Sequence, residues 1–170
     1  MVMLDMIGRA YSMMRFVLSQ LKSMKKLAQL SFIPRSTDFG LLVLRLWFGL
    51  TLLLNHGVGK LHNYSARSGH FPDPLGIGSQ ASLILAIIAE TLCALCVAIG
   101  FATRLAALLI VIELTVAFFR VHHHVLAMGP GSGELPFLYI GAFLAIVCAG
   151  PGRHAVCKIT NDLTPATPAA

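Results

Sequence analysis

Four apolar stretches dominate the pattern of hydrophobic and polar positions along the chain. A helix needs roughly 20 apolar residues to cross a hydrocarbon core of about 30 Å, and each stretch comes near that length. Proline and glycine gather between the stretches, where they favour turns. The pattern therefore predicts an all-α integral membrane protein with a four-transmembrane-helix bundle formed by residues 39–57, 80–99, 104–121 and 135–150.

A further helix is predicted ahead of the first stretch. Across residues 1–33, polar side chains recur every three or four positions, and apolar side chains fill the other face. This spacing is typical of a helix that lies in the membrane interface, either as a plain lipid anchor or as a docking helix for a partner. The predicted domains are a basic amphipathic helix (1–33), a membrane domain (34–157) and a disordered tail (158–170).

Composition and charge agree with a membrane protein. Hydrophobic residues make up 56% of the chain and charged residues only 12%, which leaves too little polar surface to cover a soluble globule. Thirteen Lys and Arg stand against seven Asp and Glu, and six of these bases precede residue 36. We expect this local positive charge to attract the anionic lipid of a bilayer and not nucleic acid, because no groove-reading fold accompanies it.

The basic residues also predict an orientation. The connection between the second and third stretches, residues 100–103, is so short that these two helices must run antiparallel. Bases concentrate in cytoplasmic segments of membrane proteins, so we expect a multi-pass protein of the inner (plasma) membrane with both termini in the cytoplasm. The bases on this side are Arg9, Arg15, Lys22, Lys25, Lys26, Arg35, Arg104, Arg153 and Lys158.

Three charged residues fall inside the apolar stretches and away from their ends. A charge at mid-bilayer costs about 2.5 to 3.5 kcal/mol on insertion scales, so each one needs a partner or a function. Glu90 and Glu113 lie at the middle of the second and third stretches, and Arg45 lies within a turn of the middle of the first. We expect the three to meet in the interior. They form either a structural ion cluster or a site in which an unpaired carboxyl group handles protons, and in the second case they are the catalytic candidates.

One face of the first helix continues from Arg45 toward the exoplasmic rim. Gly49, His56 and Lys60 follow on this face at helical spacing. The face is a candidate lining for a ligand pocket, with Gly49, His56 and Lys60 as cofactor-binding candidates. For Gly49, a close helix crossing is the alternative.

Histidines and cysteines suggest two further chemistries. Most histidines map to the exoplasmic ends, but three consecutive ones point about 100° apart on a helix and cannot easily share one ion, so no metal site is predicted. Cys93 and Cys96 share a helix face as a C-x-x-C pair, either as packing residues or as a redox dithiol. The exoplasmic histidines are His56, His62, His70, His122, His123 and His124.

Several motifs in order resemble those of the DoxX family. They are Leu44-Arg45-Leu46 and Gly49, His56 through Leu61, Glu90, Ile99 through Ala107, Glu134, and Gly150-Pro151-Gly152-Arg153. The resemblance implies a small four-helix inner-membrane protein. It also implies a relation to the membrane subunit of thiosulfate:quinone oxidoreductase and to membrane complexes of thiol and redox-stress defence. It transfers the positions of Arg45, His56, Lys60, Glu90 and Arg104, without assigned roles.

Two function classes follow. In the first, the chain is a subunit of a quinone-linked oxidoreductase system, possibly acting on thiols or sulfur compounds, in which the Arg/Glu cluster binds a quinone head group and a partner supplies electrons. No motif for a tightly bound cofactor is present. In the second, it is a non-catalytic membrane scaffold for a soluble partner. A small transporter would need a homo-oligomer, because four helices rarely enclose an alternating-access site. Whether the chain is itself an enzyme stays open at this point.

Overall fold

The computed structural model describes residues 13–25, 36–126, 129 and 131–156, and these are helices and loops without a strand. The chain divides into two compact units between Ser36 and Thr37. In the first unit, residues 13–25 form a helix whose side chains are all exposed. The predicted helix is therefore present over this range. The rest of residues 1–33, Cys157 and the predicted tail lie outside the described residues.

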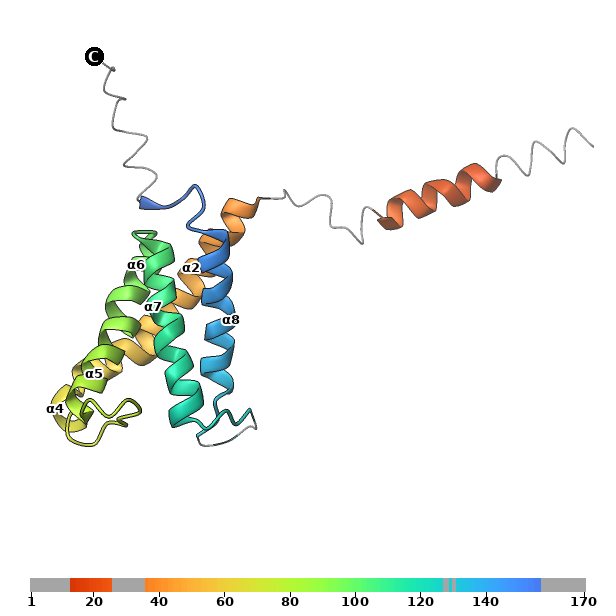
Figure 1. Ribbon diagram of the computed structural model, residues 1–170. Helices are drawn as coiled ribbons and strands as arrows, with labels where there is room; N and C mark the ends of the chain where they lie inside the picture. The colour runs from red at the N-terminus through yellow and green to blue at the C-terminus, as the bar shows by residue number, and fades with distance from the viewer. Residues whose placement is uncertain (1–12, 26–35, 127–128, 130, 157–170) are drawn as a thin grey trace, which may run out of the picture. The chain divides into compact units, whose positions relative to one another are not determined.

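The second unit contains four long helical segments that closely follow the predicted stretches (Figure 1). The first consists of α2 (Thr37–Leu52), η1 (Leu53–Gly57) and α3 (Val58–His62), and the second of α5 (Ser79–Ile87), η2 (Ile88–Cys93) and α6 (Ala94–Ile99). The third consists of α7 (Thr103–Val116) and η3 (Ala117–Val121), and the fourth is α8 (Glu134–Ala149). A short helix, α4 (Tyr64–Arg67), begins the loop before α5.

Length and apolar composition single out two of these segments as candidate membrane spans. Thr37–His62 and Ser79–Ile99 are each long and apolar enough to cross a membrane, and α8 is apolar but shorter. Large apolar side chains on their outer surfaces are exposed, among them Trp47 and Leu92. These outward faces are suited to contact with hydrocarbon.

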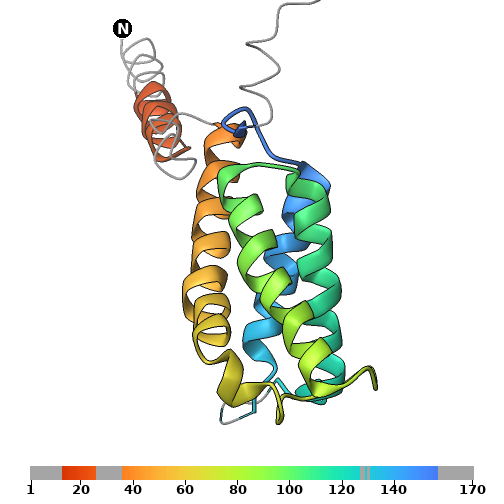
Figure 2. The same cartoon turned by 90° about the vertical axis from the view of Figure 1, so that its left-hand side faces the viewer.

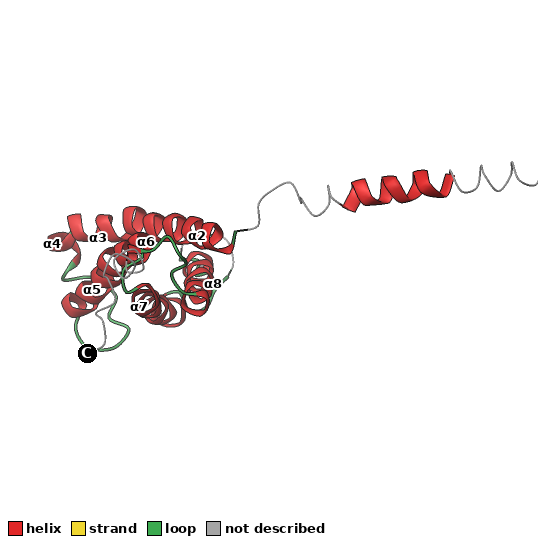
Figure 3. Cartoon of the chain, turned by 90° about the horizontal axis from the view of Figure 1, so that it is seen from above, coloured by secondary structure: helices red, strands yellow, loops and turns green. Residues whose placement is uncertain are grey.

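The four segments pack around a shared apolar core. Helix α2 packs against α6 and α8, and α7 packs against α6 and α8, as the view along the helices shows (Figure 3). Small side chains let the backbones approach, and larger ones fill the space between them. The fully buried core side chains include Leu52, Ala94, Val97, Ala107, Ile110, Phe143 and Ile146.

The tight turn between α6 and α7 follows from one glycine. Gly100 has φ +85°, a conformation that favours glycine. Its N–H donates to the Val97 carbonyl, and the Phe101 N–H donates to the Cys96 carbonyl at 2.9 Å. This pair of bonds is a Schellman motif, which ends α6 and turns the chain directly into α7. The turn lies at the same end of the unit as the start of α2 and the end of α8 (Figure 2), as the antiparallel hairpin predicted.

Candidate functional site

A pocket of about 270 Å³ lies among the helices, near the loops that precede α5 and α8. We call it the polar pocket, because it contains the buried charged side chains described below. Each of the four helical segments contributes to its walls, and the loop before α5 covers part of it. The lining is mostly apolar and carries a small set of polar groups, which is the usual composition of a small-molecule site. The polar and aromatic lining residues are His56, Lys60, Phe71, Glu90, Glu113, His122, Ser132 and Tyr139.

An ion pair joins two helices at this pocket. The Lys60 ammonium donates a hydrogen bond to the Glu90 carboxylate. The two side chains are only 15% and 5% exposed, so water screens the pair little. Because removal of either partner would leave the other charge buried and unpaired, the pair holds α3 and η2 in register.

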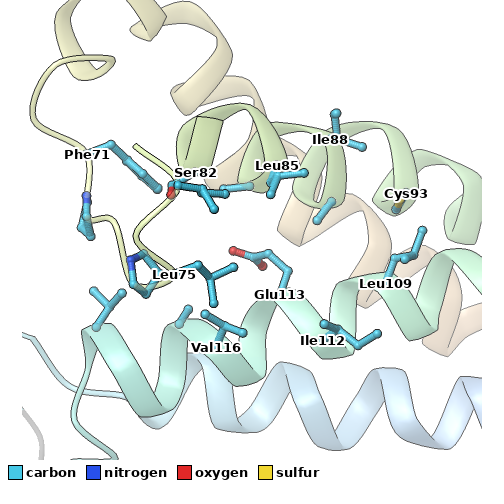
Figure 4. Close-up of a pocket in the computed structure, with 17 residues that line it drawn as sticks. Phe71, Leu75, Ser82, Leu85, Ile88, Cys93, Leu109, Ile112, Glu113 and Val116 are labelled. Carbon is cyan, nitrogen blue, oxygen red and sulfur yellow. The ribbon is translucent and has the colours of Figure 1, made fainter. Parts of the chain in front are cut away.

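Glu113 lies opposite this pair, on α7. Its Oε2 atom is buried and has no hydrogen-bond partner within the described residues. Buried carboxyl oxygens in native proteins nearly always have a partner, so an orphaned one needs an explanation, such as a ligand or a proton. The carboxyl group extends from α7 toward α5 (Figure 4).

His56 and Tyr139 form the aromatic side of the pocket. Their rings meet edge to face, with centroids 5.9 Å apart and an interplanar angle of 86°. Tyr139 also meets Phe48 edge to face, at 5.8 Å. These contacts fix the His56 ring on η1 against α8, so the imidazole faces the pocket in a defined orientation.

Three of the four helical segments widen into a π-helix at the level of this pocket. His56 lies in η1, Glu90 lies in η2, and η3 begins four residues after Glu113. A π segment interrupts the regular helix and often occurs at functional sites, because the extra residue turns a side chain out of the regular face. The widened turns therefore help to present His56 and Glu90 to one space.

The predicted meeting of Arg45 with the two glutamates is wrong. Arg45 is completely buried at the opposite end of the unit, where its Nη2 donates to the His154 carbonyl at 2.9 Å. Its position precedes Lys60 by fifteen residues, which corresponds to about 22 Å along a helix. Sequence spacing placed Arg45 and Lys60 on one helix face but could not tell which cation reaches Glu90. The ionic partner is Lys60.

Gly49 serves a helix crossing and does not line the pocket. A β-carbon on Gly49 would lie 3.0 Å from the Ala94 carbonyl oxygen and 3.2 Å from the Ala98 side chain. Its lack of a side chain lets α2 and α6 approach closely, which is the alternative that the sequence left open.

The remaining histidines and cysteines form no metal cluster among the residues that the structure describes. The His122 ring nitrogen lies 3.0 Å from the Gly131 carbonyl oxygen. Cys93 is buried, Cys96 is partly buried, and both are free thiols. The redox interpretation of the Cys93 and Cys96 pair stays a prediction.

Comparison with known proteins bears on this arrangement. The family model described as DoxX matches residues 40–123. The chain belongs to the DoxX family. No curated protein and no solved structure matches it. Together with the two long apolar helices, DoxX membership makes the chain a membrane protein.

The DoxX match includes most of the pocket but not all of it. His56, Lys60, Glu90 and Glu113 lie within the matched residues, whereas Tyr139 on α8 lies beyond them. Sequence analysis missed Tyr139, although it is the one aromatic hydroxyl in the apolar run of α8. It also treated Lys60 as a rim residue, because the first stretch was ended at residue 57 and the helix continues to His62.

Proposed function

We propose that this DoxX-family protein is a membrane subunit of a quinone-linked oxidoreductase system and binds a quinone head group in the polar pocket. The observation that carries the proposal is the buried Glu113 Oε2, which has no partner in the part of the chain that the structure describes. Glu113 lines a pocket that also holds the Lys60–Glu90 pair. A site with buried polar groups and an apolar remainder suits a flat ring with two polar edges.

The residues present fit such a ligand. Quinone oxygens accept hydrogen bonds, and the Lys60 ammonium and the His56 imidazole are donors on the pocket wall. Tyr139 supplies an aromatic face at its side. A bound quinone would supply two-electron redox chemistry, with the electrons coming from a partner protein.

The chain's own residues would hold the ring and handle protons. Glu113 and Glu90 are the two carboxyl groups at the pocket, and a carboxyl group can donate or accept a proton at hydrogen-bond distance. Lys60 keeps Glu90 in place and offsets its charge. In this assignment Glu90 and Glu113 are the proton-handling residues, and His56 and Lys60 contact the head group. Arg45 and Gly49 have no part in it.

We propose that the chain crosses the membrane four times, with both termini in the cytoplasm. The nineteen residues of Thr103–Val121 and the sixteen of α8 correspond to about 28 and 24 Å of helix. These helices are slightly shorter than a hydrocarbon core of about 30 Å, and a bilayer can thin locally to match such a helix. Arg104 and Arg120 lie near the two ends of the third segment and would reach the two interfaces.

A binding measurement tests the function. Purified protein in nanodiscs is titrated with a quinone analogue, as wild type, Glu113→Gln and Lys60→Met, each first shown to be folded under the conditions of the titration. The matched control is Glu134→Gln, because Glu134 is an exposed glutamate outside the polar pocket. We expect saturable binding that weakens about 10- to 100-fold in the two pocket variants, the equivalent of a hydrogen bond to a charged group. The control should keep wild-type binding.

The scaffold hypothesis predicts a different result. No saturable binding, or equal binding in all variants, would contradict the quinone proposal. The exposed helix over residues 13–25 then becomes the feature to follow, since its apolar side chains include Met13, Phe16 and Leu21. Such a helix binds a membrane surface or a protein partner.

A further inference from the structure

A second cavity, of about 340 Å³, is lined by the side chains that Figure 4 draws. It adjoins the polar pocket, because the two spaces share wall residues. It lies between the α5–η2 segment and the α7–η3 segment, and apolar side chains form nearly all of its wall. Glu113 lines both spaces, so its carboxyl group stands where they meet. The other residues common to both are Phe71, Pro72, Ala117 and Val121.

The apolar cavity opens toward the outside of the unit. Several of its wall residues are strongly exposed, including Leu85 on α5 and Ile112 on α7, at 50% and 53%. Helix α7 packs against α6 and η2 near the tight turn, and α5 diverges from α7 beyond that level (Figure 1). In a bilayer, this opening faces the hydrocarbon of the lipid.

The loop before α5 covers the cavity on the other side. Phe71, Pro74, Leu75 and Ile77 from this loop all line it. The loop therefore places an apolar surface between the cavity and the aqueous phase at that end, which makes the lateral opening the route without a polar barrier.

We infer that the ligand of the polar pocket carries a long hydrocarbon chain and enters sideways from the bilayer between α5 and α7. The chain occupies the apolar cavity, and the head group passes Glu113 into the polar pocket. This inference rests on the proposed function, which it deepens by naming the ligand as an amphiphile drawn from the membrane. The structural basis is that the two cavities adjoin and share wall residues, with Glu113 among them.

The alternative is a head group that arrives from the aqueous side and leaves the apolar cavity filled only with lipid. That route would make binding independent of the shape of the apolar cavity. The two routes therefore differ in how a cavity-filling substitution acts on ligands with and without a chain.

The test compares two probes that share one head group. One is a benzoquinone with a decyl chain and the other is the same benzoquinone without a chain, both titrated against the full-length protein in nanodiscs at known concentration in the lipid phase. Ala89→Phe fills the cavity from η2, because Ala89 is buried and lines it. Leu92→Phe is the matched control on the same segment, since Leu92 is exposed and lies outside the cavity.

We expect Ala89→Phe to weaken binding of the decyl probe at least tenfold and to leave binding of the chain-free probe unchanged. Leu92→Phe should change neither. Should Ala89→Phe fail to fold, Ile112→Trp narrows the cavity from the facing helix at a half-exposed position, with the same expectation.

Two outcomes separate the inference from the proposed function. If both probes bind the wild type and the cavity-filling variants weaken them equally or not at all, the lateral route is wrong and the polar site stands. If neither probe binds the wild type, the quinone proposal and the inference are both wrong.

Discussion

Gly57 and Glu90 lie in direct backbone contact where η1 crosses η2. A β-carbon on Gly57 would overlap the Glu90 carbonyl oxygen and lie 2.8 Å from the carbonyl carbon. Because these atoms belong to the backbone of Glu90, they cannot move away without displacing η2. This crossing places the two π segments against each other and thereby sets the distance between Lys60, one turn further along, and the Glu90 carboxylate.

Gly57→Ala should therefore destabilise the protein by about 1–3 kcal/mol, the range for overpacking of a tight interior. Titration with a denaturing detergent measures the free energy of unfolding of each variant. Gly59→Ala is the matched control, because a β-carbon there meets nothing within 4 Å. An equal loss of stability in Gly57→Ala and Gly59→Ala would show that the close contact between Gly57 and Glu90 does not determine the stability of the crossing.

The Lys60–Glu90 ion pair should show strong coupling in a double-mutant cycle. Lys60→Met leaves Glu90 buried without its partner, and breaking a buried pair in this way costs about 3–5 kcal/mol. Adding Glu90→Gln removes the orphaned charge, so the double variant should be more stable than the sum of the single losses predicts. Purely additive losses would show that the two side chains act independently.

Arg45 should hold the segment after α8 in place. Its hydrogen bond to the His154 carbonyl acts together with a 2.8 Å bond from the Arg153 N–H to Asp38, and a bond to a charged group is worth about 1.5–3 kcal/mol. We expect Arg45→Met to speed tryptic cleavage after Arg153 and to leave ligand binding unchanged. Arg120→Met, a charge-matched change of an exposed residue at the other end, should leave cleavage at the wild-type rate. Loss of binding in Arg45→Met with unchanged cleavage would reverse this assignment.

Asp73 should make the loop over the cavities sensitive to acid. Its carboxylate accepts hydrogen bonds from the Gly78 N–H at 2.8 Å, the Ser82 hydroxyl at 2.8 Å and the Ile77 N–H at 3.0 Å. These bonds, that from Gly78 foremost, hold the pKa of Asp73 below its usual value. The folded-state pKa is thus lower than the unfolded one, so the stabilisation is complete above the unfolded value of about 3.9 and is lost as the pH falls through the lower folded value.

The comparison with Asp73→Asn measures this effect. Hydrogen exchange of the Gly78 amide should be slower in the wild type than in Asp73→Asn at neutral pH. Once the Asp73 carboxylate is protonated, the two proteins should protect this amide equally. Protection that is equal at neutral pH would show that the carboxylate does not order the loop.

The helices were predictable from the sequence, because apolar length and Pro and Gly positions are local signals. The second, third and fourth segments begin and end within one residue of the predicted bounds. The first was ended five residues early, since His56 and Lys60 were taken as the rim, whereas the apolar side chains of Val58 and Leu61 continue the helix.

The partners of the charged residues were not predictable in the same way. Helical periodicity assigns a side chain to a face, but the depth at which two faces meet depends on helix tilt and crossing. Periodicity placed Arg45 and Lys60 on one face, and the close crossing at Gly57 brings Lys60 level with Glu90. The partner of Arg45 comes from a segment beyond α8 that has no periodicity to interpret.

The π segments make the pocket adjustable by very small changes of sequence. Each carries one residue more than a regular helix needs over that turn, so deleting that residue would restore the α-helix and leave the later side chains close to their present faces. In the first segment, such a deletion within η1 would change the side chains that this turn presents around His56, while Lys60 stays level with Glu90. One part of the pocket wall can thus change while the helix crossings on either side of it stay constant.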